Sequence, residues 1–581
     1  MTASRTGSGD ADLADRIARL SPEKRELLQR RMGETRISGF DAVARTLRSC
    51  GVTHIYGVAG QPTEKILPAC ARQQIRPIGV YHQTSAVCMA LAQNYQAGRL
   101  VAATLVSSGP AATNAITGLL VAHDNCWPTV VLGGNRASFQ RLDAIPLVEH
   151  VTKYAVDVPS ADSIAECVQT ACRQAVSGRP GPAYVQLHED ALNGSTAWPP
   201  DSSCVQEPIP SATADEVDRV ADALLSAKQP ALILGKGIRW TVKPDHLREL
   251  IEILKLPFIT SPMGRGFVPE DHPLCFNQGR AALQAGADAV LCLGTRLDWP
   301  FRHGAELAPD ARVIRVDICA HGAKAAGPVT EFIHSDAGEF VTRLLVAVQS
   351  RHHDHGSRSN WLGALEAAAR ESRRLLAERT DTDEKPISPY RMMKEIRDAL
   401  PRDAICIREG NVSMMAAQAV IPGFLPALHM DAGTSASMGI SIPFGIGAKM
   451  ACPDRPVVVV SGDYGFSLCA MEMEVCVRHN IPIVVLVANN QGNNGSNKQN
   501  AYFPGDDSEL ITMFQPGLQY EEIMKLFGGQ GETVTEPDRI GPAVEEAIAS
   551  GRPACINVVI ASNVPMPNAW GQQVGLGEVQ A

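Results

Sequence analysis

Short, continuous apolar runs alternate along the chain with longer stretches in which apolar residues recur at helical spacing. Val457–Val460 and Ile483–Val487 are rich in β-branched residues, which is typical of strands buried on both faces of a sheet. Between them, Met471 and Val475 recur at helical spacing within Cys469–His479. This order predicts one β-α-β unit with a right-handed connection and two parallel strands.

The same alternation occurs in three parts of the chain and predicts an α/β fold of three doubly wound parallel-sheet domains. We expect these domains at residues 35–195, 211–350 and 385–565. A proline- and serine-rich segment over 199–210 and a polar segment over 352–360 are predicted linkers. Residues 1–34 form a predicted helical appendage, and the tail 566–581 is either a lid over the site or disordered.

Polar residues follow both strands of the first unit described. Asp463 lies in the turn Ser461–Gly465, and Asn490 follows the next strand. Because parallel strands place their carboxyl ends at one edge of a sheet, these two side chains are expected to lie close together. One carboxylate and one amide suit Mg²⁺, and glycines let the backbone approach a diphosphate. The alternative is an ordinary polar loop after each strand.

Composition narrows the class of protein. The 581 residues are 45% hydrophobic and 20% charged, with a net charge of −9, which argues against nucleic acid or an anionic membrane surface as a partner. No apolar run is long enough to span a bilayer, and the N-terminus does not look like a signal peptide. The 15 cysteines include no C-x-x-C pair and no zinc spacing, so we expect buried thiols in a cytoplasmic protein.

The pair Gly462-Asp463, followed by Asn489-Asn490 after one helix and one strand, resembles the signature of thiamine diphosphate (ThDP) enzymes. The longer stretch GDYGFSLCAMEMEVCVRHNIPIVVLVANN is similar to the oxalyl-CoA decarboxylase and 2-hydroxyacyl-CoA lyase branch of that family. The resemblance covers about residues 36–565 and implies a pyrimidine-binding domain, a middle domain and a diphosphate-binding domain, in that order. It also implies that Asp463, Asn490 and the carbonyl of Gly492 hold Mg²⁺ on the cofactor.

The resemblance implies further cofactor contacts. Met438, within HMDAGTSASMGISIPFGIGAKMA, matches the bulky residue that keeps the cofactor bent, so that its amino group stays against the reactive carbon. The residues implied to bind the cofactor are Gln83, Asn411, Val412, Ser413, Ala436, Ser437, Met438, Asp463, Tyr464, Gly465, Asn490, Gly492 and Asn493.

Three departures from the family pattern fall on the substrate side. Gln83 replaces a glutamate that exchanges a proton with the pyrimidine, and an amide cannot titrate in a useful range. Either Gln83 supports a slower activation, or another acid substitutes, or the protein has lost the usual chemistry. Arg141 replaces a second glutamate and either points to solvent or offers a fork for a carboxylate or phosphate. Asn493-Asn494 replaces an apolar-aromatic pair, and the catalytic candidates are Gln83, Arg141 and Asn494.

Our leading hypothesis is a ThDP- and Mg²⁺-dependent lyase or carboligase that acts on a 2-oxo acid, an aldehyde or an acyl donor, in a biosynthetic role. The alternatives are a decarboxylase or lyase of acyl thioesters and a cofactor-binding relative without catalysis. The middle domain shows no basic cluster for coenzyme A, and Arg265, Arg280 and Arg302 are assigned no role. The family implies a homodimer or homotetramer, and residues 10–33 resemble docking segments of modular synthetases or form an ordinary surface helix.

Overall fold

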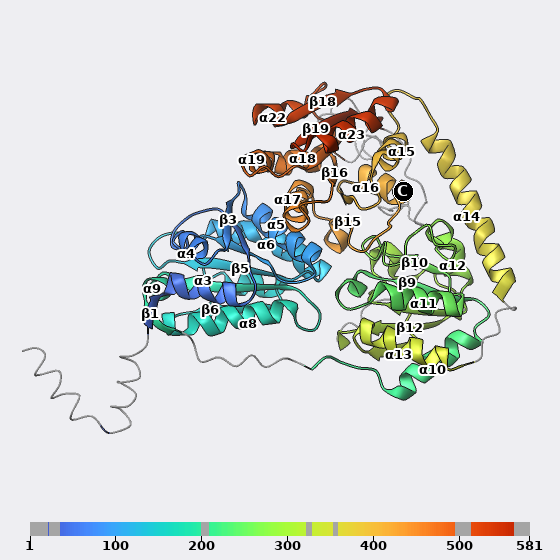
Figure 1. Cartoon of the computed structure of the whole chain (residues 1–581), viewed down its shortest axis with the longest axis horizontal. Coiled ribbons are helices and arrows are strands. Elements are labelled where there is room, and N and C mark those ends of the chain that lie inside the picture. The colour runs from blue at the N-terminus through green and yellow to red at the C-terminus, as the bar shows by residue number, and fades with distance from the viewer. Residues whose placement is uncertain are drawn as a thin grey trace, which may run out of the picture.

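The computed structural model describes residues 21, 35–198, 208–320, 328–351, 358–493 and 513–562. Three parallel sheets follow one another along the chain, each with helices packed against it (Figure 1). The predicted fold class of three doubly wound α/β domains is confirmed. The expected docking segment 10–33, apart from residue 21, and the tail 566–581 lie outside the described residues.

The first domain is built on a six-stranded sheet of order β3-β2-β4-β5-β7-β6, in which all pairs are parallel. Helices α3 and α8 contribute to the core on one face, and α5 and α6 contribute to the core on the other. The strands are β2 (His54–Gly57), β3 (Arg76–Gly79), β4 (Ala102–Val106), β5 (Thr129–Asn135), β6 (Tyr154–Val158) and β7 (Pro182–His188), with an antiparallel pair of β1 (Thr35–Ser38) and β8 (Ser195–Trp198) beside them. The helices are α3 (Gly39–Ser49), α4 (Ile66–Arg72), α5 (Gln83–Ala97), α6 (Pro110–Asn125), α7 (Ile145–Val148), α8 (Ile164–Val176) and α9 (Glu189–Asn193).

The middle domain has a five-stranded parallel sheet of order β10-β9-β11-β12-β13. Its strands read as short apolar runs in the sequence, and β9, β10 and β11 are buried along their whole length. The strands are β9 (Pro230–Leu234), β10 (Phe258–Thr260), β11 (Ala289–Leu293), β12 (Arg312–Asp317) and β13 (Glu331–His334). The helices are α10 (Ala214–Ser226), α11 (Pro244–Leu254), α12 (Arg280–Gly286) and α13 (Ala337–Gln349), followed by the long α14 (Ser359–Thr380), which leads to the third domain.

The third domain has a six-stranded parallel sheet of order β15-β14-β16-β17-β19-β18. Its strands are β14 (Ile405–Arg408), β15 (His429–Met430), β16 (Val457–Gly462), β17 (Val484–Asn489), β18 (Gln530–Val534) and β19 (Ala554–Val559). Its helices are α15 (Pro389–Ala399), α16 (Val412–Val420), α17 (Ser441–Ala451), α18 (Asp463–Cys469), α19 (Met473–Arg478), α22 (Glu521–Leu526) and α23 (Ile540–Ser550).

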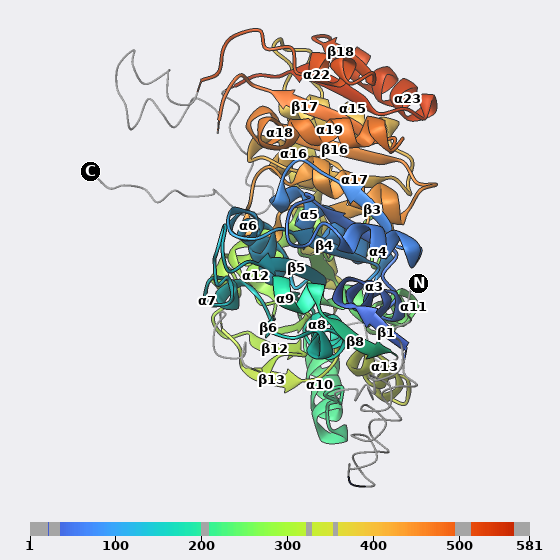
Figure 2. The same cartoon turned by 90° about the vertical axis from the view of Figure 1, so that its left-hand side faces the viewer.

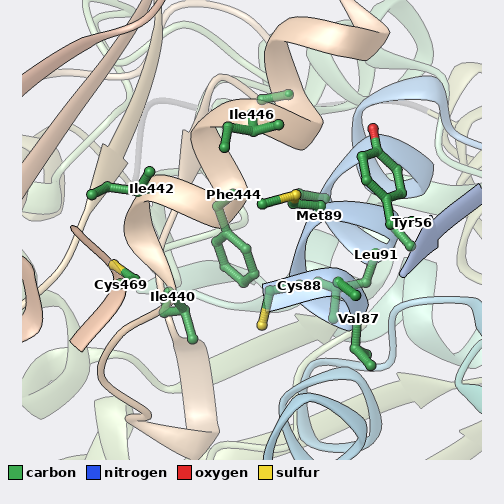
Figure 3. Close-up of a cluster of buried hydrophobic side chains, with 14 of the residues drawn as sticks. Tyr56, Val87, Cys88, Met89, Leu91, Ile440, Ile442, Phe444, Ile446 and Cys469 are labelled. Carbon is green, nitrogen blue, oxygen red and sulfur yellow. The ribbon is translucent and has the colours of Figure 1, made fainter. Parts of the chain in front are cut away.

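The first and third domains share one hydrophobic core, in which α5 packs against α17 (Figures 2 and 3). Phe444 and Ile440 of the third domain lie near Cys88 and Met89 of the first domain (Figure 3). The backbones approach so closely that a Cβ on Gly447 would lie 2.2 Å from the carbonyl oxygen of Met89. Glycine is therefore required where these two helices touch.

One predicted boundary is wrong. The sequence pattern places a turn over Ser461–Gly465 and a helix from Cys469, whereas β16 extends to Gly462 and α18 begins at Asp463. The chain therefore passes from strand to helix without a loop, and Asp463 lies in the first helical turn. Two short helices, α18 and α19, joined by a 3-10 turn over Ala470–Glu472, connect the strands in place of one helix. The first of them carries Asp463 at the sheet edge.

Candidate cofactor site

Asp463 and Asn490 meet at the carboxyl edge of the third sheet, as the sequence predicts. β16 and β17 are parallel neighbours, with Gly462 opposite Ala488, so the residue after each strand faces the same edge. The two side chains are buried, with 1% of Asp463 and 9% of Asn490 exposed. Gly492 joins them, because its N–H donates to Asp463 Oδ2 over 3.0 Å.

The polar atoms of these three residues lie within hydrogen-bonding distance of one another. One end of the Asn490 side-chain amide lies 3.3 Å from Asp463 Oδ2 and 2.9 Å from the carbonyl oxygen of Gly492. With its oxygen at that end, three oxygen atoms converge; with its nitrogen there, the amide donates to both neighbours. A carboxylate, an amide oxygen and a carbonyl oxygen are hard ligands that suit Mg²⁺. The described residues contain no cluster of three His, Cys, Asp or Glu side chains that could hold a metal.

Burial controls the charge of Asp463. Removal from water raises the pKa of its carboxyl group to about 6, and hydrogen bonds from the backbone N–H groups of Gly492 and Tyr464 oppose this rise. The Tyr464 bond to Oδ1 measures 2.8 Å. A buried carboxylate of this kind is stabilised by a cation next to it, which agrees with the oxygen ligands around it.

Asn411, Val412 and Ser413 lie at the adjoining strand end. They follow β14 and open α16, whose N-terminal N–H groups favour an anion. Gly462, at the end of β16, donates its N–H to the carbonyl oxygen of Glu409 over 3.3 Å, and Ser413 Oγ donates to the same oxygen. The N-termini of α16 and α18 therefore lie at the same edge of the sheet. Backbone N–H groups of both helices would be available to a diphosphate bound there.

The segment Ala436–Met438 adjoins this edge. Ala436 has a φ of 50° and Gly439 a φ of 80°, so the backbone reverses sharply on both sides of Met438. The Met438 side chain is 43% exposed, although it is large and apolar. A Cβ on Gly439 would lie 2.8 Å from the Cβ of Leu468, another exposed apolar residue. An exposed methionine on a tightly bent segment fits a residue that contacts a ligand.

Gln83 opens α5 in the first domain, after His82, whose side chain accepts the N–H of Thr84 at the start of the helix. Asn114 of α6 donates from Nδ2 to Gln83 Oε1 over 3.0 Å. In this orientation Gln83 Oε1 is the acceptor, and Nε2 is the donor that another group can accept. Among the described residues, no hydrogen bond joins Gln83 to Asp463.

The other substrate-side candidates differ in their surroundings. Arg141 is exposed in the loop between β5 and α7, whose neighbouring residue Gln140 packs on Gly109 at the start of α6. Asn493 is partly buried, directly after Gly492. Asn494 lies outside the described residues.

Sequence reasoning missed two residues that hold this site. Asn114 orients Gln83, and Glu409 is buried beside Gly465, whose Cβ would lie 2.3 Å from Glu409 Oε1. Glu409 could have been noticed, because it is an acid directly after a buried strand; Asn114 gave no signal, because it lies among small helical residues.

The fold and this edge define a class of α/β protein whose polar residues gather at the carboxyl end of a parallel sheet. Three family models of thiamine pyrophosphate enzymes match the chain in order: the N-terminal TPP binding domain over residues 37–157, the central domain over 217–344, and the C-terminal TPP binding domain over 409–558. TPP is another name for ThDP.

Known proteins are similar in sequence to this chain over nearly its whole length. The chain is 30% identical to 2-hydroxyacyl-CoA lyase 1 of Homo sapiens, over 91% of this chain and 95% of that protein. It is 28% identical to the acetolactate synthase large subunit IlvG of Mycobacterium tuberculosis, over 90% and 96%. It is 27% identical to the oxalyl-CoA decarboxylase of Escherichia coli, over 90% and 94%. The chain belongs to the family of thiamine pyrophosphate enzymes.

Proposed function

We propose that this protein is a ThDP- and Mg²⁺-dependent enzyme that forms or cleaves a carbon–carbon bond next to a carbonyl group, in a biosynthetic role. The observation that carries the proposal is the convergence of Asp463, Asn490 and the Gly492 carbonyl at one sheet edge. Bound ThDP supplies a carbon nucleophile that adds to a carbonyl group and stabilises the negative charge left when the neighbouring bond breaks. The changed substrate-side residues Gln83 and Arg141, together with the N-terminal appendage, are the grounds on which we include ligation in a biosynthetic role.

The chain's own residues have distinct roles in this proposal. Asp463, Asn490 and Gly492 hold Mg²⁺ on the diphosphate, and the first turn of α16 donates backbone N–H groups to it. Met438, whose side chain is exposed at this edge, would contact the bound cofactor. Gln83 donates from Nε2 to the pyrimidine ring, because Asn114 already occupies its oxygen. An amide donor holds the ring without exchanging a proton with it.

A homodimer is part of the proposal. Within one chain Gln83 bonds to Asn114 of its own domain, and Asp463 belongs to a different domain. Exposed apolar side chains lie on the segments around both positions: Tyr81, Met438, Leu468 and Met471. Such residues are typical of a surface that a partner covers. Gln83 would then act on the cofactor that the partner's Asp463 and Asn490 edge holds.

The first test measures ThDP binding by calorimetry in the presence of Mg²⁺. Asp463→Asn keeps the shape of the side chain but removes its charge, so we expect at least about a hundred-fold loss of affinity, since changes one shell further out already cost about 10- to 100-fold. Glu474→Gln, which alters an exposed ion pair with Arg478, is the matched control. Equal affinity of wild type and Asp463→Asn would refute the proposed cation site.

The second test follows hydrogen–deuterium exchange at the reactive carbon of bound ThDP. Exchange in wild type that is faster than in free ThDP would show that Gln83 permits activation. We expect Gln83→Glu to increase the exchange rate further, because a carboxyl group can exchange a proton with the ring. If neither protein exceeded free ThDP, the carboligase proposal would be wrong.

Acyl thioesters are the second candidate substrate class, favoured by the similarity to 2-hydroxyacyl-CoA lyase over 91% of the chain. Arg265 and Arg280 are buried, 4% and 1% exposed, which leaves Arg302 as the exposed arginine of the three considered. Assaying 2-oxo acids beside acyl-CoA substrates separates the two classes. If Arg141 contacts a donor carboxylate, Arg141→Ala should lower kcat/KM for that donor by about 10- to 100-fold, which corresponds to one charged hydrogen bond.

A further inference from the structure

Glu409 occupies the junction between two strands at the cofactor edge. It follows β14, its N–H donates to the carbonyl oxygen of Val460 over 2.9 Å, and its own carbonyl oxygen accepts the N–H of Gly462. The residue is 1% exposed. Its backbone thus continues the pairing of β14 with β16, and its side chain is directed into the protein directly beneath the site.

The carboxylate of Glu409 caps another helix, 30 residues further along the chain. Oε1 accepts the N–H of Gly439, and Oε2 accepts the N–H groups of Ile440 over 3.2 Å and Ser441 over 2.8 Å. These are N–H groups at the start of α17, which have no partner within the helix. An anion at this position also interacts favourably with the helix dipole.

The same carboxylate also packs against the helix that carries Asp463. A Cβ on Gly465, in the first turn of α18, would lie 2.3 Å from Glu409 Oε1. One buried side chain therefore contacts both the segment after Met438 and the start of α18. These are the two elements whose relative position decides where the bend and the diphosphate of a cofactor can lie.

We propose that Glu409 is a positioning residue that holds the Ala436–Met438 segment and the start of α18 in register for the cofactor. This inference rests on the proposed ThDP function, because the register matters only if a cofactor binds there. The role uses the carboxylate as an acceptor, since the three backbone groups facing it are N–H donors. Burial raises the pKa of Glu409, and hydrogen bonds from the Ser441 side chain and from these N–H groups oppose the rise. An amide at this position would turn an N–H group toward at least one of these donors.

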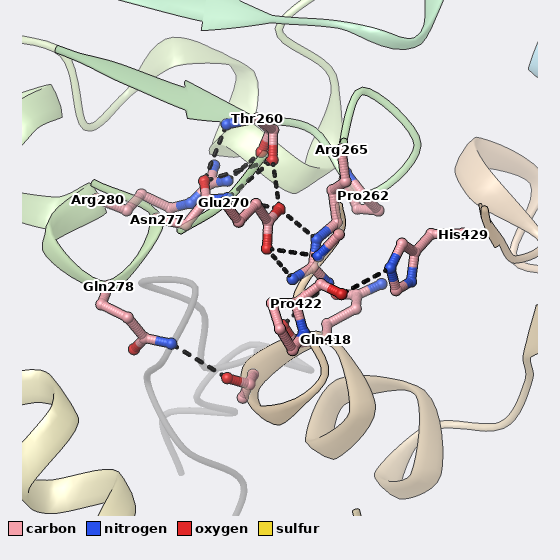
Figure 4. A network of polar contacts seen from close by, with 12 residues as sticks. Thr260, Pro262, Arg265, Glu270, Asn277, Gln278, Arg280, Gln418, Pro422 and His429 are labelled. Carbon is pink, nitrogen blue, oxygen red and sulfur yellow. Dashed lines mark hydrogen bonds and ion pairs between the residues drawn. The ribbon is translucent and has the colours of Figure 1, made fainter. Parts of the chain in front are cut away.

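Glu409→Gln is the direct test, with Glu270→Gln as the matched control. Glu270 is another buried carboxylate: it pairs with Arg265 and accepts the N–H of Gly423 over 3.1 Å (Figure 4). It lies in the middle domain, outside the cofactor edge. Both variants remove one buried charge, so a general loss of stability should affect them alike, whereas a positioning role affects only Glu409.

Two measurements separate these outcomes. Hydrogen exchange of the cofactor-free protein should show faster exchange of the backbone amides of residues 439–441 in Glu409→Gln, with Glu270→Gln like wild type there. Calorimetry with ThDP and Mg²⁺ should show about 10- to 100-fold weaker binding for Glu409→Gln. Glu409→Asp keeps the charge but has a shorter reach, so its affinity should lie between Glu409→Gln and wild type. If Glu409→Gln does not fold, the ThDP affinity of Glu409→Asp tests the proposal in its place.

The possible failures differ from those of the proposed function. If wild type binds no ThDP, the proposed function is wrong, and the positioning role is wrong with it. If wild type binds ThDP and Glu409→Gln binds it equally well, the positioning role alone is wrong. Equal losses in Glu409→Gln and Glu270→Gln would reduce Glu409 to an ordinary structural residue and would also overturn the inference.

Discussion

At the cofactor edge, the side chains packed around a residue decide which residue fits there more than that residue's own chemistry does. Gly465 belongs to a glycine-rich motif, which in the sequence suggests room for a diphosphate. In the structure, the space beside it is filled by the Glu409 carboxylate. The glycine therefore serves protein packing in addition to any approach of a ligand. The same carboxylate fixes the start of α17, so both effects come from one side chain.

We expect Gly465→Ala to lower the free energy of unfolding by about 1–3 kcal/mol, because its Cβ would overlap Glu409 Oε1. ThDP affinity should fall as well. Gly363 in α14 is the control: it is exposed, nothing lies within 4 Å of its added Cβ, and Gly363→Ala should stabilise the helix by up to about 1 kcal/mol. Denaturant unfolding measures both. A Gly465→Ala protein as stable as wild type would show that Glu409 moves freely.

Among the elements, β2 and α5 are joined by a polar chain inside the first domain. The Tyr56 hydroxyl donates to Gln93 Oε1 over 2.7 Å, and Gln93 Nε2 lies 3.0 Å from His54 Nδ1. With the tyrosine hydroxyl as donor, Gln93 Nε2 donates toward Nδ1, which is then unprotonated and also lies 2.9 Å from the Thr53 hydroxyl oxygen. The helix that begins at Gln83 is thus tied to its sheet by a neutral histidine.

This arrangement makes stability depend on pH. Burial and the charge of Arg76 lower the pKa of His54 from 6.5 to about 4. Above pH 6.5 the ring is neutral in both states, and between 6.5 and about 4 only the unfolded chain takes up the proton, so stability falls as the pH falls through this window.

We therefore expect acidification from pH 6.5 to 4 to lower the melting temperature of wild type by about 2–4 °C more than that of His54→Gln. His123→Gln, at an exposed histidine of α6, should behave as wild type. Identical pH profiles of wild type and His54→Gln would contradict the neutral-histidine assignment.

At the scale of the whole molecule, Lys236 links all three domains. From the middle domain its Nζ donates to the carbonyl oxygen of Asp124 over 2.8 Å, to Asn125 Oδ1 over 3.1 Å and to Thr434 Oγ1 over 2.9 Å. Asp124 and Asn125 end α6 in the first domain, and Thr434 precedes Ala436 in the third. A residue remote from the cofactor edge thereby anchors the segment that carries Met438.

Lys236→Met should leave Asp124, Asn125 and Thr434 without this partner. We expect scanning calorimetry to show a lower melting temperature and a broader transition, because the domains unfold less cooperatively. ThDP affinity should fall by less than in Asp463→Asn. Lys243→Met, at an exposed lysine that precedes α11, is the control. An unchanged transition would mean that the three domains are held together by their apolar contacts alone.

The sequence by itself determined the three α/β domains and the placement of Asp463 and Asn490 at one sheet edge. The apolar runs predicted the positions of the strands. Asp463 and Asn490 could be placed at one edge because strands joined by a β-α-β connection are parallel, so both end at the same edge of the sheet. Both predictions depend on the order of residues within one β-α-β unit, which can be seen directly in the sequence.

Only the tertiary structure decided what surrounds that edge. The Glu409 carboxylate accepts the N–H groups of Gly439, Ile440 and Ser441. Asn114 donates to the Gln83 amide, and Lys236 bonds to residues of the other two domains. The spacing of these residues in the sequence does not predict the contacts. The physical reason is that local propensity sets helices and strands, whereas a hydrogen bond between distant segments depends on how closely whole helices pack. The α5–α17 contact through Gly447 is such a case.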